Sequence, residues 1–380
     1  MQIQNATNIA DLRLIAKRRV PRVVFDILDG ASEDERALAR NLARLREHSL
    51  VPRVLRGAEQ RDQSTTLFGK TYASCFGISP TGLIGLLRRD IELMLATAAQ
   101  QANLPMALSG VSAAPLETVV ARAPGQIWAQ LYAAKDPKIN ADLVRRAQEC
   151  GTGVLVWTID MGAAPKNERL NRSGVGIPPR LSLVSKLEAL THPAWIYEYL
   201  RGGMTRIGSW EPYVPPGAPP FEAHKLFMAQ RFGALTWRQL ETLRQLWKGP
   251  LIVKGILHPD DAARVAELGA DGVIVSNHGG IGLDRAPASI DMLPGVVAAV
   301  GHKLTVMFDS GVRRGSDIVV ARCLGAKFVF VGRATLYGVV AGGVPGALRA
   351  IDILKDEVDR TMGQIGCRNG DELNPEFVQR

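Results

Sequence analysis

One histidine stands in a segment whose residue types suit acid-base chemistry. His278 belongs to the segment SNHGG at residues 276–280, and it is the only one of the six histidines followed by two glycines. An imidazole titrates in the range that a general base requires. We therefore predict that His278 is a catalytic base and that Asp160 orients its ring and stabilises the imidazolium. A lone histidine is more often structural, so the prediction depends on its neighbours.

A lysine follows a short apolar run and is expected to be buried. Lys254 comes directly after Leu251-Ile252-Val253. A buried cation needs an anionic partner, because removing an unpaired charge from water is costly. A reduced flavin or an enolate would supply that partner. A structural ion pair is the alternative.

Two later segments combine glycine with arginine in a way that suits phosphate binding. Residues 309–313 read DSGVR, and Gly332 precedes Arg333. In (β/α) barrels, the loops after the last two strands commonly bind a phosphate through backbone N–H groups and a nearby cation. The alternative is that the glycines form tight turns and the arginines are solvated. Because both segments fall at the expected strands, we favour phosphate.

These residues follow short apolar runs that alternate with segments of helical period. This pattern is typical of a parallel α/β fold, and eight such runs predict a closed (β/α)8 TIM barrel. An open doubly wound sheet is the alternative, but neither GxGxxG nor GxxxxGK[ST] occurs in the chain. Pro259 is expected to begin one helix, with Gly269 after its end. The predicted strands are residues 75–79, 105–109, 127–132, 153–158, 251–254, 272–276, 305–309 and 328–332.

The remaining segments are expected to be additions to the barrel. Residues 1–70 read as a helical cap with a small hairpin at 64–68, residues 71–367 as the barrel, and residues 368–380 as a C-terminal tail. A Pro- and Gly-rich insertion at about 174–235, after the fourth strand, carries an aromatic patch at Trp195, Tyr197 and Tyr199. Insertions of this kind on a rigid scaffold are usually lids or contact surfaces.

Composition narrows the class of partner and the compartment. The net charge is +9, but the basic residues are scattered and fit no nucleic-acid motif, so no nucleic-acid partner is expected. The four cysteines lie far apart, which indicates neither a disulfide framework nor a metal site. The polar N-terminus does not resemble a signal peptide, and no apolar run reaches 18 residues. A cytoplasmic location follows as the expectation.

The motifs SNHGG, DSGVRRG and VKG, in this order and spacing, resemble those of the FMN-dependent α-hydroxy acid oxidases and dehydrogenases. This is the family of glycolate oxidase, lactate dehydrogenase and mandelate dehydrogenase. The resemblance runs from about Asp11 to Cys367 and includes FDILDGASEDE, SPTGL, QLYAAKD, LTW and GCR. It implies an FMN cofactor, hydride transfer from a small hydroxy or amino substrate to the flavin, and a homotetramer.

The resemblance also implies roles for individual residues. His278 would take the substrate proton with Asp160 paired to it, Tyr132 would line the substrate side, and Lys254 would offset negative charge on the reduced flavin. Residues implied to contact the flavin ring and ribityl chain are Ser79, Pro80, Thr81, Gly82, Ser109, Gln130, Thr158, Lys254, Ser276 and His278. Residues implied to hold the ribityl and phosphate end are Asp309, Gly311, Arg313, Gly332 and Arg333.

Three positions depart from the family's pattern. The family grips the substrate carboxylate with a tyrosine and two arginines, whereas this chain has Ile27, Asn167 and Ile281 in their places. An unpaired, desolvated carboxylate would lose roughly several kcal/mol. We therefore expect a neutral or bulkier substrate, such as an alcohol, a hydroxy-acid ester or amide, or an amine.

Other functions remain open on the sequence. A genuine 2-hydroxy acid dehydrogenase would need a relocated cation, for which Lys166, Arg169 and Arg285 are candidates. A flavoprotein without turnover and a non-redox barrel enzyme acting on a phosphorylated metabolite are further alternatives. Gly82 resembles the dehydrogenase members more than the oxidases, which favours a quinone or protein acceptor over oxygen. The aromatic insertion could then lie on a membrane, although a lid or a subunit contact is preferred.

Overall fold

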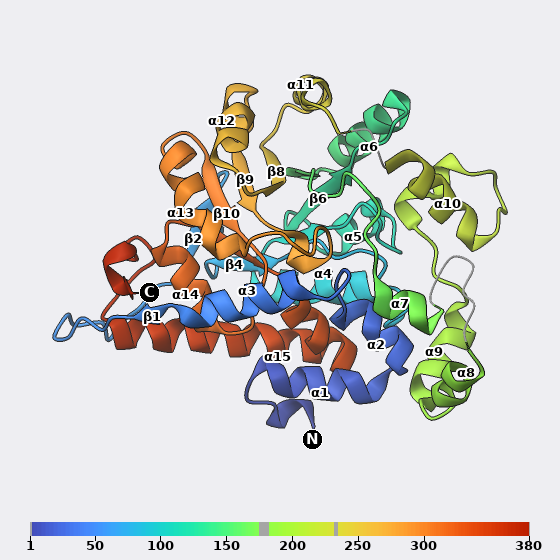
Figure 1. Cartoon of the computed structure of the whole chain (residues 1–380), viewed down its shortest axis with the longest axis horizontal. Helices are drawn as coiled ribbons and strands as arrows, with labels where there is room; N and C mark the ends of the chain where they lie inside the picture. Colours follow the sequence, from blue (N-terminus) through green and yellow to red (C-terminus); the bar gives the residue numbers. More distant parts are fainter. Residues whose placement is uncertain (1, 175–181, 232–234, 380) are drawn as a thin grey trace.

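The centre of the molecule is a closed barrel of eight parallel strands (Figure 1). The structure is a computed structural model that describes residues 2–174, 182–231 and 235–379. The strands follow the order β10-β11-β4-β5-β6-β7-β8-β9 around the barrel, which confirms the predicted fold and all eight predicted strands. They are β4 (Phe76–Ile78), β5 (Met106–Leu108), β6 (Ile127–Tyr132), β7 (Leu155–Thr158), β8 (Leu251–Ile256), β9 (Gly272–Val275), β10 (Thr305–Phe308) and β11 (Phe328–Val331).

Helices with clear start signals surround the strands. α12 begins at Pro259 as predicted, with the His258 side chain accepting from the Asp260 N–H, and Gly269 follows its end at a φ of +79°. The Asp136 side chain caps α6 in the same way, ahead of Pro137. The outer helices are α4 (Ile91–Ala102), α5 (Leu116–Arg122), α6 (Pro137–Glu149), α11 (Trp237–Leu246), α12 (Pro259–Glu267), α13 (Ser289–Val300), α14 (Gly315–Cys323) and α15 (Arg333–Ile365).

The last helix, α15, is the longest element that the structure describes. Its backbone leaves helical geometry at Gly342 and Gly343, just before Pro345. In length and composition it would suffice to cross a membrane, the only such case among the described helices, but 67% of its apolar window is buried inside the molecule. It lies against α1 (Ile9–Arg19) and α4, as Figure 1 shows for α1 at the base of the view. α15 is therefore a core helix.

The N-terminal residues form three α-helices and a hairpin. The cap helices are α1, α2 (Arg22–Asp29) and α3 (Arg36–Glu47). The hairpin pairs β2 (Thr65–Leu67) with β3 (Lys70–Tyr72), so it extends two residues beyond the expected boundary at residue 70. Leu67 and Tyr72 belong to one buried apolar cluster with Trp128 and Phe328. The hairpin therefore closes one end of the barrel.

The C-terminal tail returns to the cap. β12 (Val378–Gln379) pairs antiparallel with β1 (Ser49–Leu50), so the C-terminal tail and the segment after α3 share a small sheet. The short helix η4 (Pro375–Phe377) precedes β12, and its Phe377 is 2% exposed. At the other end of the chain, η1 (Ile3–Asn5) precedes α1.

The insertion after the fourth strand is helical where it is described. It contains α8 (Leu183–Ala189), α9 (Pro193–Gly202), η2 (Gly208–Tyr213) and α10 (Pro220–Arg231), and α7 (Glu168–Ser173) precedes it. Residues 175–181 and 232–234 of the expected insertion lie outside the described residues. The Trp195 ring stacks on Tyr199 with centroids 5.3 Å apart, and its indole N–H donates to the Leu86 carbonyl at 2.8 Å. This bond attaches α9 to the loop that follows β4.

Candidate active site

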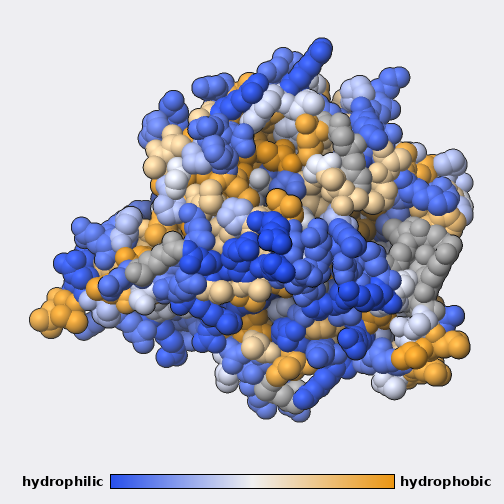
Figure 2. Space-filling view, viewed as in Figure 1, coloured by the Kyte–Doolittle hydropathy of each residue, from blue (hydrophilic) through white to orange (hydrophobic). Residues whose placement is uncertain are grey.

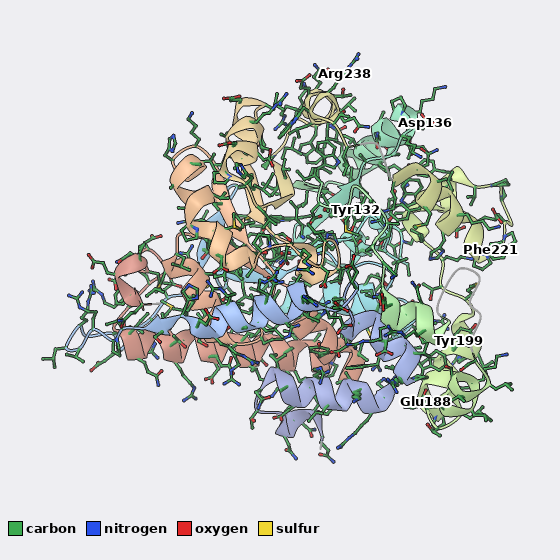
Figure 3. All side chains as sticks on the ribbon, viewed as in Figure 1. Tyr132, Asp136, Glu188, Tyr199, Phe221 and Arg238 are labelled. Carbon is green, nitrogen blue, oxygen red and sulfur yellow. The ribbon has the colours of Figure 1, made fainter. Side chains whose placement is uncertain are left out.

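Three of the predicted catalytic side chains meet at the carboxyl ends of the strands. Nδ1 of His278 lies 2.9 Å from Oδ1 of Asp160. Nε2 of the same ring lies 3.4 Å from the Tyr132 hydroxyl, and the two rings are stacked with centroids 6.4 Å apart. The His278 side chain keeps 16% of its surface exposed, so the ring is reachable. Figure 3 places Tyr132 near the middle of the molecule.

The backbone around His278 is unusual. His278 has a φ of +57°, and Gly279 and Gly280 follow at +65° and +80° in the short helix η3 (His278–Gly280). A left-handed conformation costs a non-glycine residue about 1–3 kcal/mol unless its surroundings fix it. Here the His278 N–H donates to Ser276 Oγ at 3.0 Å, and the Gly279 N–H donates to Ser310 Oγ at 3.0 Å. These two hydrogen bonds hold the loop that presents the imidazole.

A glycine that the sequence analysis did not single out makes room for Asp160. Gly255 follows Lys254 in β8, at a bulge in the pairing of β8 with β9, and has a φ of +106°. A Cβ at this position would lie 2.6 Å from both Cβ and Cγ of Asp160. The third residue of the VKG motif therefore has to be small for the carboxylate to reach His278.

Opposing effects determine the charge state of Asp160. Burial acts to raise the pKa of this carboxyl, but the nearby His278 and Lys254 hold the pKa below its ordinary value. Its second oxygen, Oδ2, is buried and has no hydrogen-bond partner among the described residues. Asp160 is therefore an anion that can hold the imidazole with Nδ1 protonated and Nε2 available as a base.

Lys254 has an anionic partner inside the protein. The side chain is 3% exposed, and its Nζ lies 3.2 Å from Asp309 Oδ2 and donates to Ser276 Oγ at 2.8 Å. Asp309 also accepts from the hydroxyl of Ser79 at 3.0 Å and from that of Ser310 at 2.9 Å. The alternative of a structural ion pair is thus present in the structure. This network links Lys254 on β8 to residues that follow β4, β9 and β10.

Two buried polar atoms on neighbouring strands fit the expected flavin. Nε2 of Gln130 on β6 and Oγ1 of Thr158 on β7 have no hydrogen-bond partner among the residues described. The other amide atom, Gln130 Oε1, accepts from the Gly110 N–H at 3.1 Å. Buried polar groups are normally satisfied, so orphaned ones indicate an absent ligand. An isoalloxazine ring offers carbonyl oxygens and ring nitrogens that match these two side chains.

The segment SPTGL lies close enough to its neighbours to form one wall of the same space. A Cβ on Gly82 would lie 2.2 Å from Val111 Cγ2 and 2.7 Å from Ser109 Oγ. A Cβ on Gly332 would lie 3.7 Å from both Ser79 and Thr81. The ring and ribityl chain could therefore be held by Ser79, Thr81, Ser109, Gln130, Thr158, Lys254 and Ser276. Pro80 lies between the first two of these residues.

The two arginines expected at the phosphate contact protein groups in this structure. The guanidinium of Arg333 donates to the carbonyls of Leu28, Gly30 and Gly279 at 3.0, 2.7 and 2.8 Å. Burial, with the nearby Arg313, lowers the pKa of Arg333 to about 10. Arg313 donates to the Val312 carbonyl at 2.8 Å and lies 5.8 Å from the centroid of Tyr337. The Arg313 backbone N–H donates to Asp317 Oδ2 at 2.8 Å, so the loop groups that could still meet a phosphate are those at Gly311, which has a φ of +90°, and at Gly332 and Arg333.

The three departures from the family pattern lie on separate elements. Ile27 is on α2, Ile281 follows η3, and Asn167 caps α7 by accepting from the Leu170 N–H at 3.0 Å. Two of the three cations that could replace the carboxylate clamp are already paired with acidic residues. Lys166 pairs with Glu168 at 2.8 Å; Arg169 pairs with Asp26, Asp29 and Glu35; Arg285 is exposed at the surface.

A further arginine near the site was missed by the sequence analysis. The guanidinium carbon of Arg231, the last residue of α10, lies 5.1 Å from the ring centroid of Tyr132. Arg231 belongs to no motif. Its only sequence signal is its position where the insertion returns to the barrel.

Known proteins resemble this chain over nearly its whole length. A family model described as FMN-dependent dehydrogenase matches residues 16–380. A putative L-lactate dehydrogenase of Mycobacterium tuberculosis is 38% identical over 98% of this chain and 89% of its own. The crystal structure of the monotopic membrane protein (S)-mandelate dehydrogenase is 36% identical, covers 99% of this chain and 100% of its own, and has a TM-score of 0.94. An arginine-to-leucine variant of mandelate oxidase with 2-hydroxy-phenylacetamide is 30% identical, covers 99% and 98%, and has a TM-score of 0.80.

Proposed function

Because this chain belongs to the FMN-dependent dehydrogenase family, we propose that it oxidises a small hydroxy compound whose headgroup is neutral or bulkier than that of lactate. The observation that carries the proposal is the contact of His278 with Asp160 on one ring nitrogen and Tyr132 on the other. Cations and hydrogen-bonding side chains that suit a flavin surround this group. The chain acts as an enzyme on CH–OH donors, and an amine with a CH–NH bond is a chemically adjacent substrate.

His278 is proposed to do the acid-base work. Asp160 accepts from Nδ1 and thereby leaves Nε2 to take the proton of the substrate hydroxyl. FMN, when bound, would supply the hydride acceptor for the carbon that bears this hydroxyl, so the product would be a carbonyl compound. Tyr132 borders the space at Nε2 and restricts where the hydroxyl can lie. Lys254 would stabilise negative charge that develops near the strand ends.

Two observations support the proposed headgroup. The side chains of Ile27 and Ile281 offer no donor to a carboxylate, and Asn167, whose Oδ1 caps a helix, carries no positive charge. The mandelate oxidase variant shows that a relative altered at an arginine has been solved with an amide, 2-hydroxy-phenylacetamide. A lactate-like 2-hydroxy acid is the second candidate, favoured by the names of the relatives. It would need a cation from another element.

We also propose that the enzyme binds peripherally to the cytoplasmic face of a membrane and passes its electrons to a quinone. Figure 2 shows hydrophobic residues gathered over α8 and α9, at the lower right of the view. The relative (S)-mandelate dehydrogenase is a monotopic membrane protein. The exposed apolar side chains of these two helices are Leu183, Val184, Leu187, Leu190, Tyr197, Tyr199 and Leu200.

A homotetramer, implied by the family resemblance, would be tested by light scattering in mild detergent.

An anaerobic reduction screen tests the catalytic proposal. We expect mandelamide, 1-phenylethanol or a related neutral alcohol to bleach the visible absorbance of the purified holoenzyme. His278→Ala should retain the flavin and lose bleaching by about 10²–10⁴-fold in rate, because the base is gone. His302→Ala changes an exposed histidine and serves as the control. Bleaching that survives in His278→Ala would show that the proposed base is wrong.

A further inference from the structure

The end of α10 is attached to the barrel mouth by its own backbone and side chain. The carbonyl of Gln230 accepts from the Lys135 N–H at 2.9 Å, and its side-chain Oε1 accepts from the Asp136 N–H at 3.0 Å. Lys135 and Asp136 follow β6, the strand that ends in Tyr132. These two bonds fix where the next residue, Arg231, leaves the helix.

An aromatic wall positions the guanidinium of Arg231. Phe227, one turn earlier on α10, packs edge-on against Tyr132 and Trp210 with centroids 5.8 and 5.2 Å apart. The indole N–H of Trp210 donates to the Gly110 carbonyl at 3.1 Å, which joins this wall to the turn after β5. The guanidinium carbon of Arg231 lies 4.9 Å from the centroid of Phe227 and 5.1 Å from that of Tyr132. A guanidinium over an aromatic face is held by cation–π attraction.

The charges near Arg231 indicate that it belongs to the mouth of the site. Burial lowers the pKa of this guanidinium, and the nearby Tyr132 and Asp160 act to raise it. The cation therefore interacts electrostatically with the carboxylate that contacts His278. Because Tyr132 also touches Nε2 of His278, the arginine and the proposed base border the same tyrosine.

We propose that Arg231 determines substrate specificity by donating to an oxygen acceptor on the substrate headgroup, a carboxylate or a carboxamide carbonyl, beside Tyr132. The inference rests on the proposed function, because it assumes that the substrate lies at His278. Arginine suits this role because its planar group offers several N–H donors and keeps its charge. One cation from the insertion thus takes the place of the tyrosine and two arginines for which this chain has Ile27, Asn167 and Ile281, and it binds neutral headgroups as well as charged ones.

Binding measurements on the holoenzyme test the inference without relying on turnover. Dissociation constants are measured from changes in the flavin spectrum for (S)-2-phenylpropionate, its amide and 2-phenylpropane, which lack the reacting hydroxyl. Arg231→Met should raise the dissociation constants of the acid and the amide about 10- to 100-fold, as expected for loss of a hydrogen bond to a charged donor. The dissociation constant of the hydrocarbon should not change. Arg231→Lys should restore the affinity for the acid more fully than the affinity for the amide.

A matched variant separates a local effect from a general one. Arg201 lies 5.4 Å over the ring of Tyr197 on α9, so Arg201→Met removes the same type of contact away from His278. We expect no change in any of the three dissociation constants. For oxidisable mandelamide, Arg231→Met should raise KM more than it lowers kcat.

The possible failures are distinguishable. The inference is overturned if Arg231→Met leaves the affinity of acid and amide relative to the hydrocarbon unchanged, or if the wild type shows no preference for either over the hydrocarbon. Neither result bears on the base, which is judged by bleaching in His278→Ala. If that variant still bleaches while Arg231→Met weakens binding, the headgroup site stands and the proposed base fails.

Discussion

At the scale of single residues, the proposed chemistry depends on which imidazole nitrogen faces the substrate. Asp160 contacts Nδ1 in the structure, which leaves Nε2 as the nitrogen proposed to take the proton. Because the pKa of Asp160 lies below its ordinary value of 3.8, the carboxylate keeps its charge at every pH above that value. We therefore expect the loss of activity on the acid side to report another group.

Gly255→Ala tests the position of Asp160. The new methyl group would overlap Asp160 Cβ and Cγ, and the residue would be strained at a φ of +106°. We expect the carboxylate to move from His278 and the anaerobic reduction rate to fall by about 10²–10⁴-fold with flavin still bound. Asp160→Asn should give a loss of similar size, because it supplies the wrong tautomer.

Gly162→Ala is the control for this experiment. A Cβ at Gly162 would meet nothing within 4 Å, and its φ is not positive. Stopped-flow reduction of all three variants is compared with the wild type. A normal rate in Gly255→Ala would mean that Asp160 does not need the position seen here.

At the scale of elements, the sequence predicted what depends on local pattern. The runs before Ser79, Lys254 and Asp309 were recognised as strands because buried parallel strands are continuously apolar. The motif histidine was found because its residue type is distinctive. The contacts of Arg333 were not predicted, because its side chain reaches residues about 300 positions earlier in the chain. Arg231 was missed because only the folded insertion brings α10 over Tyr132.

The helices α8 and α9 expose leucine side chains that could enter a membrane. Leu187 and Leu200 are 65% and 75% exposed, and burial in lipid would contribute roughly 1.5–3 kcal/mol for each leucine. We expect the double change Leu187→Glu and Leu200→Glu to abolish co-sedimentation with vesicles containing anionic lipid. Reduction of the flavin by substrate in solution should be unchanged.

A fully exposed leucine elsewhere provides the control. Leu55 is 102% exposed in the loop between β1 and β2, far from α8 in Figure 1. Leu55→Glu should sediment with vesicles as the wild type does. If the double variant also still sediments, the α8–α9 surface is not the membrane contact.

At the scale of the whole molecule, FMN is expected to be part of the folded structure. Gln130 and Thr158 each have a buried polar atom without a partner among the described residues, which the flavin ring would satisfy, and the buried charge of Arg333 is one that a nearby phosphate would offset. At a free concentration one hundred times its dissociation constant, FMN should raise the free energy of unfolding by about 2.7 kcal/mol. Urea denaturation with and without FMN measures this.

Riboflavin separates the ring from the phosphate in the same assay. It keeps the isoalloxazine and ribityl chain but lacks the anion expected near Gly311 and Gly332. We expect its dissociation constant to be at least roughly tenfold larger, because charge-assisted hydrogen bonds are lost. Equal affinities for FMN and riboflavin would contradict a phosphate site at these loops.

The three carbonyls bound by Arg333 have a consequence for the order of assembly. Leu28 and Gly30 are translated early, yet their partner is made about 300 residues later, after every strand of the barrel. On the ribosome, the first helices would therefore wait almost to the end of synthesis before they can dock. Their apolar faces stay open to chaperones in the meantime, and a truncation before Arg333 would remove its bonds to the carbonyls of Leu28 and Gly30.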